Sequence, residues 1–488
     1  MKRHLITSAI PYINGVKHLG NLVGSQLPAD LFARYQRAKG NEVLFLCATD
    51  EHGTPAELAA DKAGKPVAEY CDEMHTLQSK LAIGFRLSFD HFGRSSSRQN
   101  HRLTQHFAAK LSERGLIKEI LEKQVFSNQD QRFLPDRYIE GTCPNCGFEE
   151  ARGDQCDNCT KQLQPNELVN PRSTISGSTD LEERETMHLH LRQSLMREEL
   201  ESWIDSKSDW PILTTSIAKK WLNDGDGLQD RGITRDLKWG IPVKKGKSDW
   251  PGMDEKVFYV WFDAPIGYIS STKEWAAAKG VDWKPYWCDE DTQLVHFIGK
   301  DNIVFHCIIF PIMLKASERY ILPENVPANE FLNLEGKKIS TSKNWAVWLH
   351  EYLEEFPDQQ DVLRYVLSSN APETKDNDFT WEEFQARNNN ELVAIFGNFI
   401  NRVMVLSHKY YRGSVPEPGK EFEEDKKVLE KMAQLPKKIG HAIENFHFRE
   451  ASQTLISLAR LGNKYLADAE PWKLINTDPE RVKTIMNT

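Results

Sequence analysis

The sequence contains no long hydrophobic run, no internal repeat and no low-complexity linker. None of its apolar stretches approaches the roughly 18 residues that a membrane-spanning helix needs, which excludes a spanning segment. The N-terminus, MKRHLITSAIPY, has a basic start, but its apolar run before Pro11 is too short for a signal peptide. These absences predict a cytoplasmic protein with no membrane partner.

The sequence also lacks an excess of basic residues. It has 62 Lys and Arg against 71 Asp and Glu, and its net charge is −9. This charge argues against nucleic acid coating the whole surface, although it permits a local basic surface. A chain of 488 residues is too long for one hydrophobic core and predicts two to four domains.

Cysteines are few, and four of the eight fall within one short segment, CPNCGFEEARGDQCDNC. Each of its two Cys-x2-Cys pairs can turn two sulfurs toward one point, the pattern typical of a zinc site closed by four thiolates. Two disulfides or four unrelated thiols are the alternatives, and a reducing compartment disfavours disulfides. We therefore predict one structural Zn²⁺ that holds a small lobe together, bound by Cys143, Cys146, Cys156 and Cys159.

The first fifty residues have the pattern of a strand–helix–strand unit. Residues 4–10 are predicted as a buried strand, and residues 19–39 carry apolar side chains at helical spacing. The continuously apolar segment NEVLFLCATD is typical of a parallel strand covered on both faces. Polar residues follow this strand, at the edge where open α/β sheets bind ligands.

The rest of the chain divides by composition. Residues 117–230 contain the cysteines, several turn signals and a predicted charged helical tract near 181–205, so we interpret them as an insertion. Strands are predicted to return at KVFYVWFDAPIGY (256–268) and at QLVHFIGKD, before a helix over 302–316. From about residue 381 the apolar spacing is helical throughout, which predicts a helix bundle.

Two segments carry the pattern of a nucleotide site. In SAIPYINGVKHLGNL, Gly20 lies in the first turn of a helix, where a residue without a side chain lets a flat base approach the backbone. The helix N-terminus offers N–H groups to phosphates, and His18 adds a donor. Far downstream, EGKKISTSKNW is a Gly-, Ser- and Lys-rich loop of the kind that closes over a triphosphate. Taken alone, a structural turn explains the first segment and a solvated basic turn explains the second.

Together, these segments resemble the His-Ile-Gly-His and Lys-Met-Ser-Lys-Ser signatures of class I aminoacyl-tRNA synthetases. The segments AIPYINGVKHLGN, DEHGTP, FLPDRYIEGTCPNC, YVWFDAPIGY and HFIGKDN narrow the resemblance to the methionyl-tRNA synthetase family. It implies an α/β fold with a Rossmann-like parallel-sheet catalytic domain, a zinc-binding connective insertion and an all-α anticodon-binding helix bundle. The implied domains are the first catalytic half (1–116), the connective insertion (117–230), the second catalytic half (231–322), a linker or stem-contact region with the KISTS loop (323–380), and a bundle, expected to be truncated (381–488).

The resemblance further implies ATP-dependent attachment of L-methionine to methionine tRNA through methionyl-adenylate, with Mg²⁺ accompanying ATP. No covalent enzyme intermediate is needed, so catalysis depends on positioning and on charge stabilisation at phosphorus. We expect this chain to be a monomer, and a homodimer if a C-terminal extension exists. Two alternatives stay open, namely a tRNA-binding relative with weakened catalysis and a different class I synthetase.

The residues implied by the resemblance fall into three groups. Asp50 is expected to pair with the substrate ammonium, with helix capping as its alternative role, and the other residues of the methionine pocket are expected to be Ile10, Tyr12, Arg235, Trp261, Tyr268, Asp301 and His306. ATP binding is expected at His18, Gly20, Asn21, Lys338 and Thr341, with His18, Asn21 and Lys338 as the catalytic residues. The anticodon readers are expected to be Asn398, Arg402 and Trp472.

Two positions depart from the family signatures. Asn21 stands where the signature has a second histidine, so a donor that could be cationic becomes a neutral amide. Thr341 stands where the loop usually has its second lysine. Lys338 is retained, and Lys337 or Lys343 are candidates to compensate for the lost charge. We interpret both departures as variants within the family.

Overall fold

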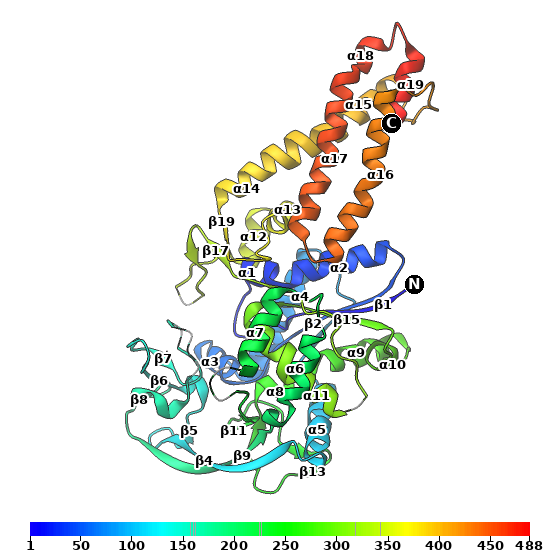
Figure 1. Ribbon diagram of the computed structural model, residues 1–488. Coiled ribbons are helices and arrows are strands. Elements are labelled where there is room, and N and C mark those ends of the chain that lie inside the picture. Colours follow the sequence, from blue (N-terminus) through cyan, green and yellow to red (C-terminus); the bar gives the residue numbers. More distant parts are fainter. Residues whose placement is uncertain are drawn as a thin grey trace. The chain divides into compact units, whose positions relative to one another are not determined.

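The computed structural model describes residues 1–156, 158, 159, 161, 163–223, 225, 227–317, 319–341 and 343–488. The chain forms two compact units, of which unit one contains residues 1–17, 40–83 and 88–328 and unit two contains residues 18–39, 84–87 and 329–488. Figure 1 shows the helices and strands of both units. No helix formed by the described residues has both the length and the apolar character needed to cross a membrane.

Unit one is built on a five-stranded sheet with the order β16-β15-β1-β2-β3. β1 is parallel to both β15 and β2, so that Leu5 lies opposite Leu294 and Leu44, and β2 is parallel to β3. All of β2 from Leu44 onward is buried, as its continuous apolar run predicts for a strand covered on both faces. The predicted Rossmann-like parallel sheet is therefore confirmed, with strands β1 (Arg3–Ser8), β2 (Glu42–Thr49), β3 (His91–Arg94), β15 (Thr292–Gly299) and β16 (Ala328–Asn329).

Helices of unit one contribute to one large hydrophobic core with β1, β2 and β15. Phe107, Trp287 and Phe310 are fully buried within it. The helices of this core are α5 (Arg98–Glu113), α8 (Val260–Asp263), α9 (Gly267–Lys279), α10 (Lys284–Cys288), the π-helical η6 (Phe305–Ile309) and α11 (Phe310–Ser317). Two further helices, α3 (Thr54–Lys62) and α4 (Val67–Gly84), bury Ala56 and Cys71 in a separate small cluster.

The strand predicted over residues 256–268 is wrong for most of its length. Only β14 (Val257–Phe258) is extended, and the chain then enters α8 and α9. Aromatic and β-branched residues favour strands, but here the helices are buried on nearly all sides. A segment with no polar face shows no helical period, so its sequence pattern could not distinguish the two structures.

The insertion is dominated by a long antiparallel pair, β4 (Ile117–Ser127) and β9 (Leu181–Leu191). Their register runs without a break from Ile117 opposite Leu191 to Ser127 opposite Leu181. The charged helix predicted near 181–205 is therefore wrong before α6 (Arg197–Asp205). The charged residues 182–185 are exposed, whereas His188, Leu189 and Leu191 are buried, and pairing with β4 overrides the local preference for helix. The insertion also contains β5 (Arg132–Phe133) and α7 (Ile212–Asn223), and β10 (Arg231–Gly232) follows it.

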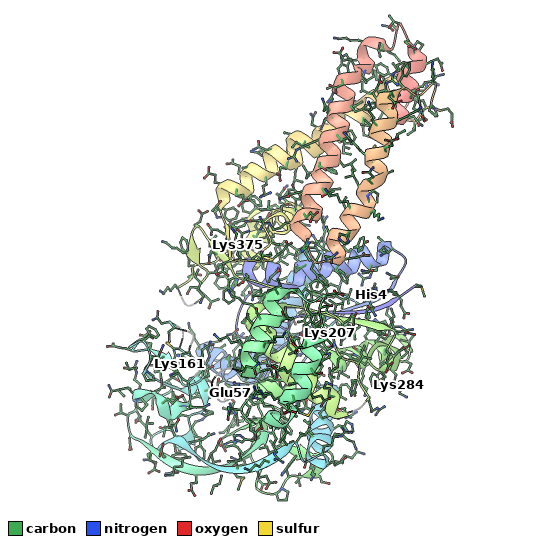
Figure 2. The ribbon with its side chains drawn as sticks, in the orientation of Figure 1. His4, Glu57, Lys161, Lys207, Lys284 and Lys375 are labelled. Carbon is green, nitrogen blue, oxygen red and sulfur yellow. The ribbon has the colours of Figure 1, made fainter. Side chains whose placement is uncertain are left out.

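A buried glutamate connects α3 to the insertion within unit one. Glu57, which is labelled in Figure 2, lies in this unit. It accepts a hydrogen bond of 2.5 Å from the Tyr138 hydroxyl and one of 2.9 Å from the Trp239 backbone N–H. Arg132 lies over the Tyr138 ring at 4.3 Å. These contacts bring together side chains from three widely separated parts of the sequence.

Unit two contains a small three-stranded sheet and a set of helices (Figure 1). α16 and α17 lie side by side, and Tyr465, Val482 and Ile485 are buried in the core they share with α15 and α19. The predicted all-α region from residue 381 is confirmed. The elements are α1 (Leu19–Asn21), the π-helical η1 (Leu22–Gln26), α2 (Leu27–Ala38), β17 (Leu332–Leu334), β18 (Lys337–Lys338), α12 (Leu349–Glu355), α13 (Gln360–Ser369), β19 (Asn377–Phe379), α14 (Trp381–Arg387), the π-helical η7 (Asn388–Gly397), α15 (Asn398–Tyr411), α16 (Glu423–Glu444), α17 (Phe448–Ala469), α18 (Pro471–Leu474) and α19 (Pro479–Asn487).

Candidate active site and metal centre

Four cysteine side chains converge on one point in the insertion. The sulfur atoms of Cys143, Cys146, Cys156 and Cys159 lie within 4.8 Å of one another, and none of the four is in a disulfide. Two of the S···S distances are 3.8 Å and 3.6 Å. A tetrahedron with Zn–S bonds of about 2.3 Å has S···S edges of roughly 3.8 Å, so the thiols fit a four-coordinate zinc ion.

Local backbone turns produce this convergence. The Cys143 N–H donates to the Phe148 carbonyl (2.8 Å), and the Cys156 N–H donates to the Lys161 carbonyl (2.9 Å). Gly147 closes the first turn with a φ of +73°, a conformation that favours glycine. The lobe around the cysteines has only short strands, β6 (Ile139–Thr142), β7 (Ala151–Arg152) and β8 (Val169–Ser173).

In unit one, the turn after β1 is tied to the end of β2. The Asp50 N–H donates to the Pro11 carbonyl (2.9 Å), and the Ile13 N–H donates to the Asp50 carbonyl (2.8 Å). Tyr12 therefore lies opposite Asp50 in an isolated parallel bridge. Ile10 and Tyr12 lie on this turn, as predicted, and Asp50 does not cap the next helix, because Gly53 occupies the N-cap of α3.

Three consecutive polar residues at the end of β2 have different environments. Glu51 accepts hydrogen bonds from Arg94 at 2.8 Å and 2.9 Å, and His52 binds the buried Asp263 at 2.7 Å. Asp50 is 6% exposed, and its Oδ1 has no hydrogen-bond partner among the described residues. Burial and the neighbouring carboxylates of Asp263 and Glu51 raise the pKa of Asp50 well above its usual value. Asp50 thus has a carboxylate oxygen available to a cationic ligand.

A buried hydrogen-bond chain links two of the predicted pocket residues. The Tyr268 hydroxyl lies 2.9 Å from Nε2 of His306, and Nδ1 of His306 lies 2.9 Å from the Asn302 carbonyl. Because a carbonyl only accepts, Nδ1 carries the proton and Nε2 accepts from Tyr268. Burial lowers the pKa of His306 to about 4, so the imidazole is neutral at physiological pH.

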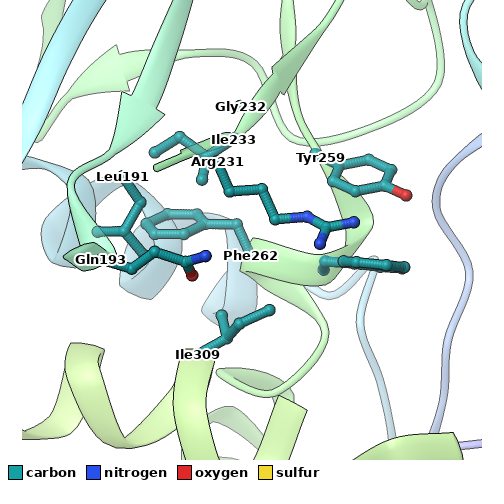
Figure 3. A pocket seen from close by; sticks show the side chains of 9 residues that line it. Leu191, Gln193, Arg231, Gly232, Ile233, Tyr259, Phe262 and Ile309 are labelled. Atoms are coloured by element: carbon teal, nitrogen blue, oxygen red, sulfur yellow. The ribbon is translucent and has the colours of Figure 1, made fainter. Parts of the chain in front are cut away.

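Trp261 lies between an aromatic ring and a cation. It meets Phe305 edge to face with ring centroids 4.6 Å apart, and the guanidinium of Arg231 lies over its ring at 3.6 Å. Trp261 and Arg231 line a pocket that also includes Tyr259, Phe262 and Ile309 (Figure 3). No local pattern identifies Arg231 as the partner of Trp261, because the contact depends on the pairing of β10 with β9.

Arg235 and Asp301 are the remaining predicted pocket residues of unit one. The guanidinium of Arg235 binds the Asp136 carboxylate at 3.1 Å and lies over the Tyr259 ring at 3.8 Å. Asp301 is exposed in the turn after β15. Arg235 therefore already has a carboxylate partner within the protein.

In unit two, the His-Leu-Gly-Asn segment forms a reciprocal helix cap. Nδ1 of His18 accepts from the Gly20 N–H (3.1 Å), and the Asn21 side chain accepts from the His18 N–H (3.1 Å). A Cβ on Gly20 would lie 2.9 Å from the His18 ring, so this arrangement requires glycine. Asn21 can make this bond through its amide oxygen, which gives one structural reason for asparagine at this position.

The His18 segment and the KISTS loop lie together in unit two. The Leu19 N–H donates to the Val347 carbonyl (3.2 Å), and His18 pairs with Trp348 in an antiparallel bridge. A Cβ on Gly20 would meet Ile339 at 3.7 Å. Two signatures separated by more than 300 residues are thus adjacent, as a shared nucleotide site requires.

The loop itself is a hairpin whose basic side chains are exposed. Lys338 pairs with Asn333 across β17 and β18, and Ser340 and Trp345 exchange two backbone hydrogen bonds of 2.9 Å. Lys337, Lys338 and Thr341 are exposed. Ser342, the last residue of the predicted loop motif, lies outside the described residues.

The three predicted anticodon residues lie on α15 and α18. Asn398 is exposed one helical turn before Arg402, and Nη1 of Arg402 donates to the Asn463 carbonyl (3.2 Å). The Arg402 guanidinium lies 5.5 Å from the centroid of Trp472, whose side chain is 39% exposed. The bundle thus brings Arg402 and Trp472 together and leaves the Trp472 side chain partly exposed.

Comparisons with known proteins agree with this arrangement. The family model described as tRNA synthetases class I (M) matches residues 4–404, and the anticodon binding domain of methionyl tRNA ligase matches residues 415–488. A methionine–tRNA ligase from Ruegeria pomeroyi is 59% identical over 488 residues, covering 98% of this chain and 85% of the relative. The chain belongs to the methionyl-tRNA synthetase family.

Other members of the methionyl-tRNA synthetase family give the same result. A methionine–tRNA ligase from Cereibacter sphaeroides is 56% identical over 494 residues and covers 100% of this chain and 86% of the relative. The crystal structure of Mycobacterium tuberculosis methionyl-tRNA synthetase bound by methionyl-adenylate has a TM-score of 0.80, with 99% of this chain and 88% of that chain covered. At 23% identity, this likeness establishes the fold of the family member described here.

Proposed function

We propose that this protein attaches L-methionine to methionine tRNA through methionyl-adenylate, at the expense of ATP. The observation that carries the proposal is its identity of 59% with a curated methionine–tRNA ligase along nearly the whole chain. The adjacency of the His18 segment and the KISTS loop in unit two supports it independently. No observation favours a different class I synthetase or a relative with weakened catalysis.

In the proposed first step, the methionine carboxylate attacks the α-phosphate of ATP and pyrophosphate leaves. Asp50 pairs with the substrate ammonium, because it is a buried carboxylate with an oxygen that lacks a protein partner. Trp261, Tyr268 and His306 surround the thioether, and a neutral His306 suits an uncharged sulfur. Ile10, Tyr12 and Asp301 border the same substrate, while Arg235 acts on its carboxylate only if Asp136 releases it.

The ATP residues of the proposal belong to unit two. His18 and Lys338 stabilise the charge that develops on the phosphates, and Gly20 leaves space beside the His18 ring. Asn21 and Thr341 contribute neutral hydrogen bonds, so Lys338 supplies the positive charge of the loop. Mg²⁺ bound with ATP would neutralise phosphate charge. In the second step a hydroxyl of the terminal ribose of tRNA attacks the methionyl carbonyl, and AMP leaves.

We further propose that Cys143, Cys146, Cys156 and Cys159 hold a structural Zn²⁺. Four thiolates complete a tetrahedral shell and leave no coordination position for substrate, so the ion would keep the lobe folded. Asn398, Arg402 and Trp472 are proposed to read the anticodon, through hydrogen bonds to base edges and stacking on the indole. The proposed domains are those of the sequence analysis, with the insertion at 117–230 and the bundle from 381.

Methionine-dependent ATP–pyrophosphate exchange tests the proposal. We expect exchange that saturates with methionine and charging of methionine tRNA with radiolabelled methionine. Leucine serves as the matched control amino acid, because it has a similar volume without the thioether. Failure to exchange at saturating methionine would favour a relative that has lost catalysis. Exchange with leucine at a similar kcat/KM would favour a different class I synthetase.

A further inference from the structure

The indole of Trp261 is held between two side chains from distant parts of unit one. The guanidinium of Arg231 lies over its ring at 3.6 Å, and Phe305 meets the ring edge to face with centroids 4.6 Å apart. A cation over an indole face is attracted by the ring quadrupole, and the attraction is strongest where water is excluded. These two contacts restrict the orientation of the Trp261 ring. The proposed mechanism uses Trp261 as a wall for the methionine thioether and gives Arg231 no role.

The backbone joins the segment that carries Arg231 to the segment that carries Trp261. β10 contains Arg231 and pairs with β9. Just after β10, the Ile233 N–H donates to the Leu189 carbonyl of β9 at 2.7 Å. The Ile233 carbonyl accepts from the N–H of Tyr259, the residue that precedes α8, at 2.9 Å. Both members of the cation–π pair are therefore anchored to the same hydrogen-bonded framework.

Arg231 has no carboxylate partner among the described residues. The neighbouring Asp136 is bound to Arg235, whose guanidinium also lies over the Tyr259 ring at 3.8 Å. Burial lowers the pKa of Arg231 to about 10, so its guanidinium stays charged at physiological pH. Figure 3 shows its side chain extending across the pocket toward Tyr259. This charge is therefore placed among aromatic rings and is not held by an acidic group.

We propose that Arg231 is a positioning residue for methionine, whose guanidinium holds the Trp261 ring against Phe305 before the substrate arrives. A wall that is already in place spares methionine binding the entropy of ordering that side chain. Arg231 lies on the ring and acts on the substrate only through it. This inference rests on the proposed function, specifically on Trp261 as a wall of the thioether site, and it names the residue that sets the orientation of this wall.

Two variants separate the charge of Arg231 from the space that its side chain fills. Arg231→Met keeps a long apolar side chain and removes the charge, whereas Arg231→Lys keeps a charge and removes the planar group. Arg184→Met is the matched control, because the guanidinium of Arg184 lies over the Phe126 ring at 3.5 Å elsewhere in unit one. Trp261→Leu, alone and combined with Arg231→Met, completes a double-mutant cycle.

Steady-state kinetics give the first readout. The measurements are the methionine KM, the ATP KM and the kcat of ATP–pyrophosphate exchange, and the inhibition constant of L-methioninol. Methioninol keeps the ammonium and the thioether of methionine but lacks its carboxylate. It therefore distinguishes a residue that acts on the thioether wall from a residue that binds the substrate carboxylate.

We expect Arg231→Met to raise the methionine KM about tenfold, equivalent to about 1.4 kcal/mol and in the range of a desolvated cation–π contact. The kcat and the ATP KM should stay within about threefold of the wild type. The methioninol inhibition constant should rise by the same factor as the methionine KM. Arg231→Lys should raise both by less, and Arg184→Met should leave both unchanged. In the Trp261→Leu background, Arg231→Met should change the methionine KM less than about twofold, because the ring that Arg231 holds is gone.

Fluorine NMR gives a second readout, which a general loss of stability would not reproduce. The protein is labelled with 5-fluorotryptophan, and the resonance of Trp261 is identified by its absence from Trp261→Leu. We expect one sharp Trp261 resonance in the substrate-free wild type. In Arg231→Met this resonance should broaden or divide, because the ring then samples more than one orientation. Tryptophans outside the pocket should keep their resonances in both proteins.

An Arg231→Met protein with the methionine KM and the Trp261 resonance of the wild type would overturn the inference. Additive effects of Arg231→Met and Trp261→Leu would also overturn it, since Arg231 would then act independently of Trp261. A raised methionine KM with an unchanged methioninol constant would indicate direct binding of the carboxylate by Arg231, against the inference. A broad or divided Trp261 resonance in the substrate-free wild type contradicts it even if no Arg231 variant folds. Absence of methionine-dependent exchange in the wild type is a separate result, since it contradicts the proposed function itself.

Discussion

Replacement of Asp50 by alanine is predicted to disable methionine activation. The substrate ammonium would enter a buried site with no carboxylate to receive it, because Glu51 is bound to Arg94 and Asp263 to His52. Breaking a buried charge pair by removing one partner costs about 3–5 kcal/mol. Since each 1.36 kcal/mol is tenfold, kcat/KM for methionine in pyrophosphate exchange should fall by roughly 10²- to 10⁴-fold.

Two further variants make the Asp50 experiment specific. Asp50→Asn keeps the side-chain volume, so a loss similar to that of alanine assigns the effect to charge. Asp289→Ala is the matched control in unit one, because Asp289 forms an exposed ion pair with Arg3 and such pairs contribute less than about 1 kcal/mol. An Asp50→Ala enzyme within about threefold of the wild type would refute the assignment, since that difference is below 1 kcal/mol.

Three other predictions concern the metal, the bundle and pH. The protein should contain about one zinc ion per chain by elemental analysis. Chelation of this ion should reduce the circular-dichroism signal and should make only the segment around residues 117–170 sensitive to protease. Unchanged protease resistance would contradict a structural ion. Asp425→Ala should lower the free energy of unfolding of the bundle, measured in urea, by about 3–5 kcal/mol. The reason is that Asp425 is fully buried and binds Arg481 at 2.5 Å and 2.8 Å. A loss below about 1 kcal/mol would contradict this prediction. Burial raises the pKa of Glu373 from 4.5 to about 7. The folded protein therefore binds this proton more tightly than the unfolded chain, and the resulting stabilisation, full below pH 4.5, is lost as pH rises through 7. Glu373→Gln should flatten the stability profile between about pH 4.5 and 7, and an unchanged slope there would count against it.

Features that depend on neighbours in the chain were predictable from the sequence. The cluster of four cysteines follows from two Cys-x2-Cys pairs, because each pair forms its turn locally and one small lobe then brings the four sulfurs within 4.8 Å of one another. The parallel strand β2 follows from its continuous apolar run, which fits a strand buried on both faces. The helical bundle follows from apolar side chains at a spacing of three and four residues.

Local pattern failed where burial was uniform or where a distant strand decided the structure. Residues 260–263 and 267–268 are helical, although the aromatic and β-branched content of the segment 256–268 favours a strand. Leu181–Leu191 is extended because it pairs along its whole length with β4, more than fifty residues earlier in the chain. In both segments the competing structures satisfy the same local preferences, and only tertiary contacts distinguish them.

The sequence by itself determined which residue types stand at the ends of the parallel strands, and hence the family and the class of chemistry. It did not determine that Glu51 and His52 are bound while an oxygen of Asp50 stays without a partner among the described residues, because that depends on Arg94 and on Asp263, 211 residues beyond His52. Electrostatic partners are set by distance in space, and only the folded chain brings these charges into a buried environment where their interaction is strong.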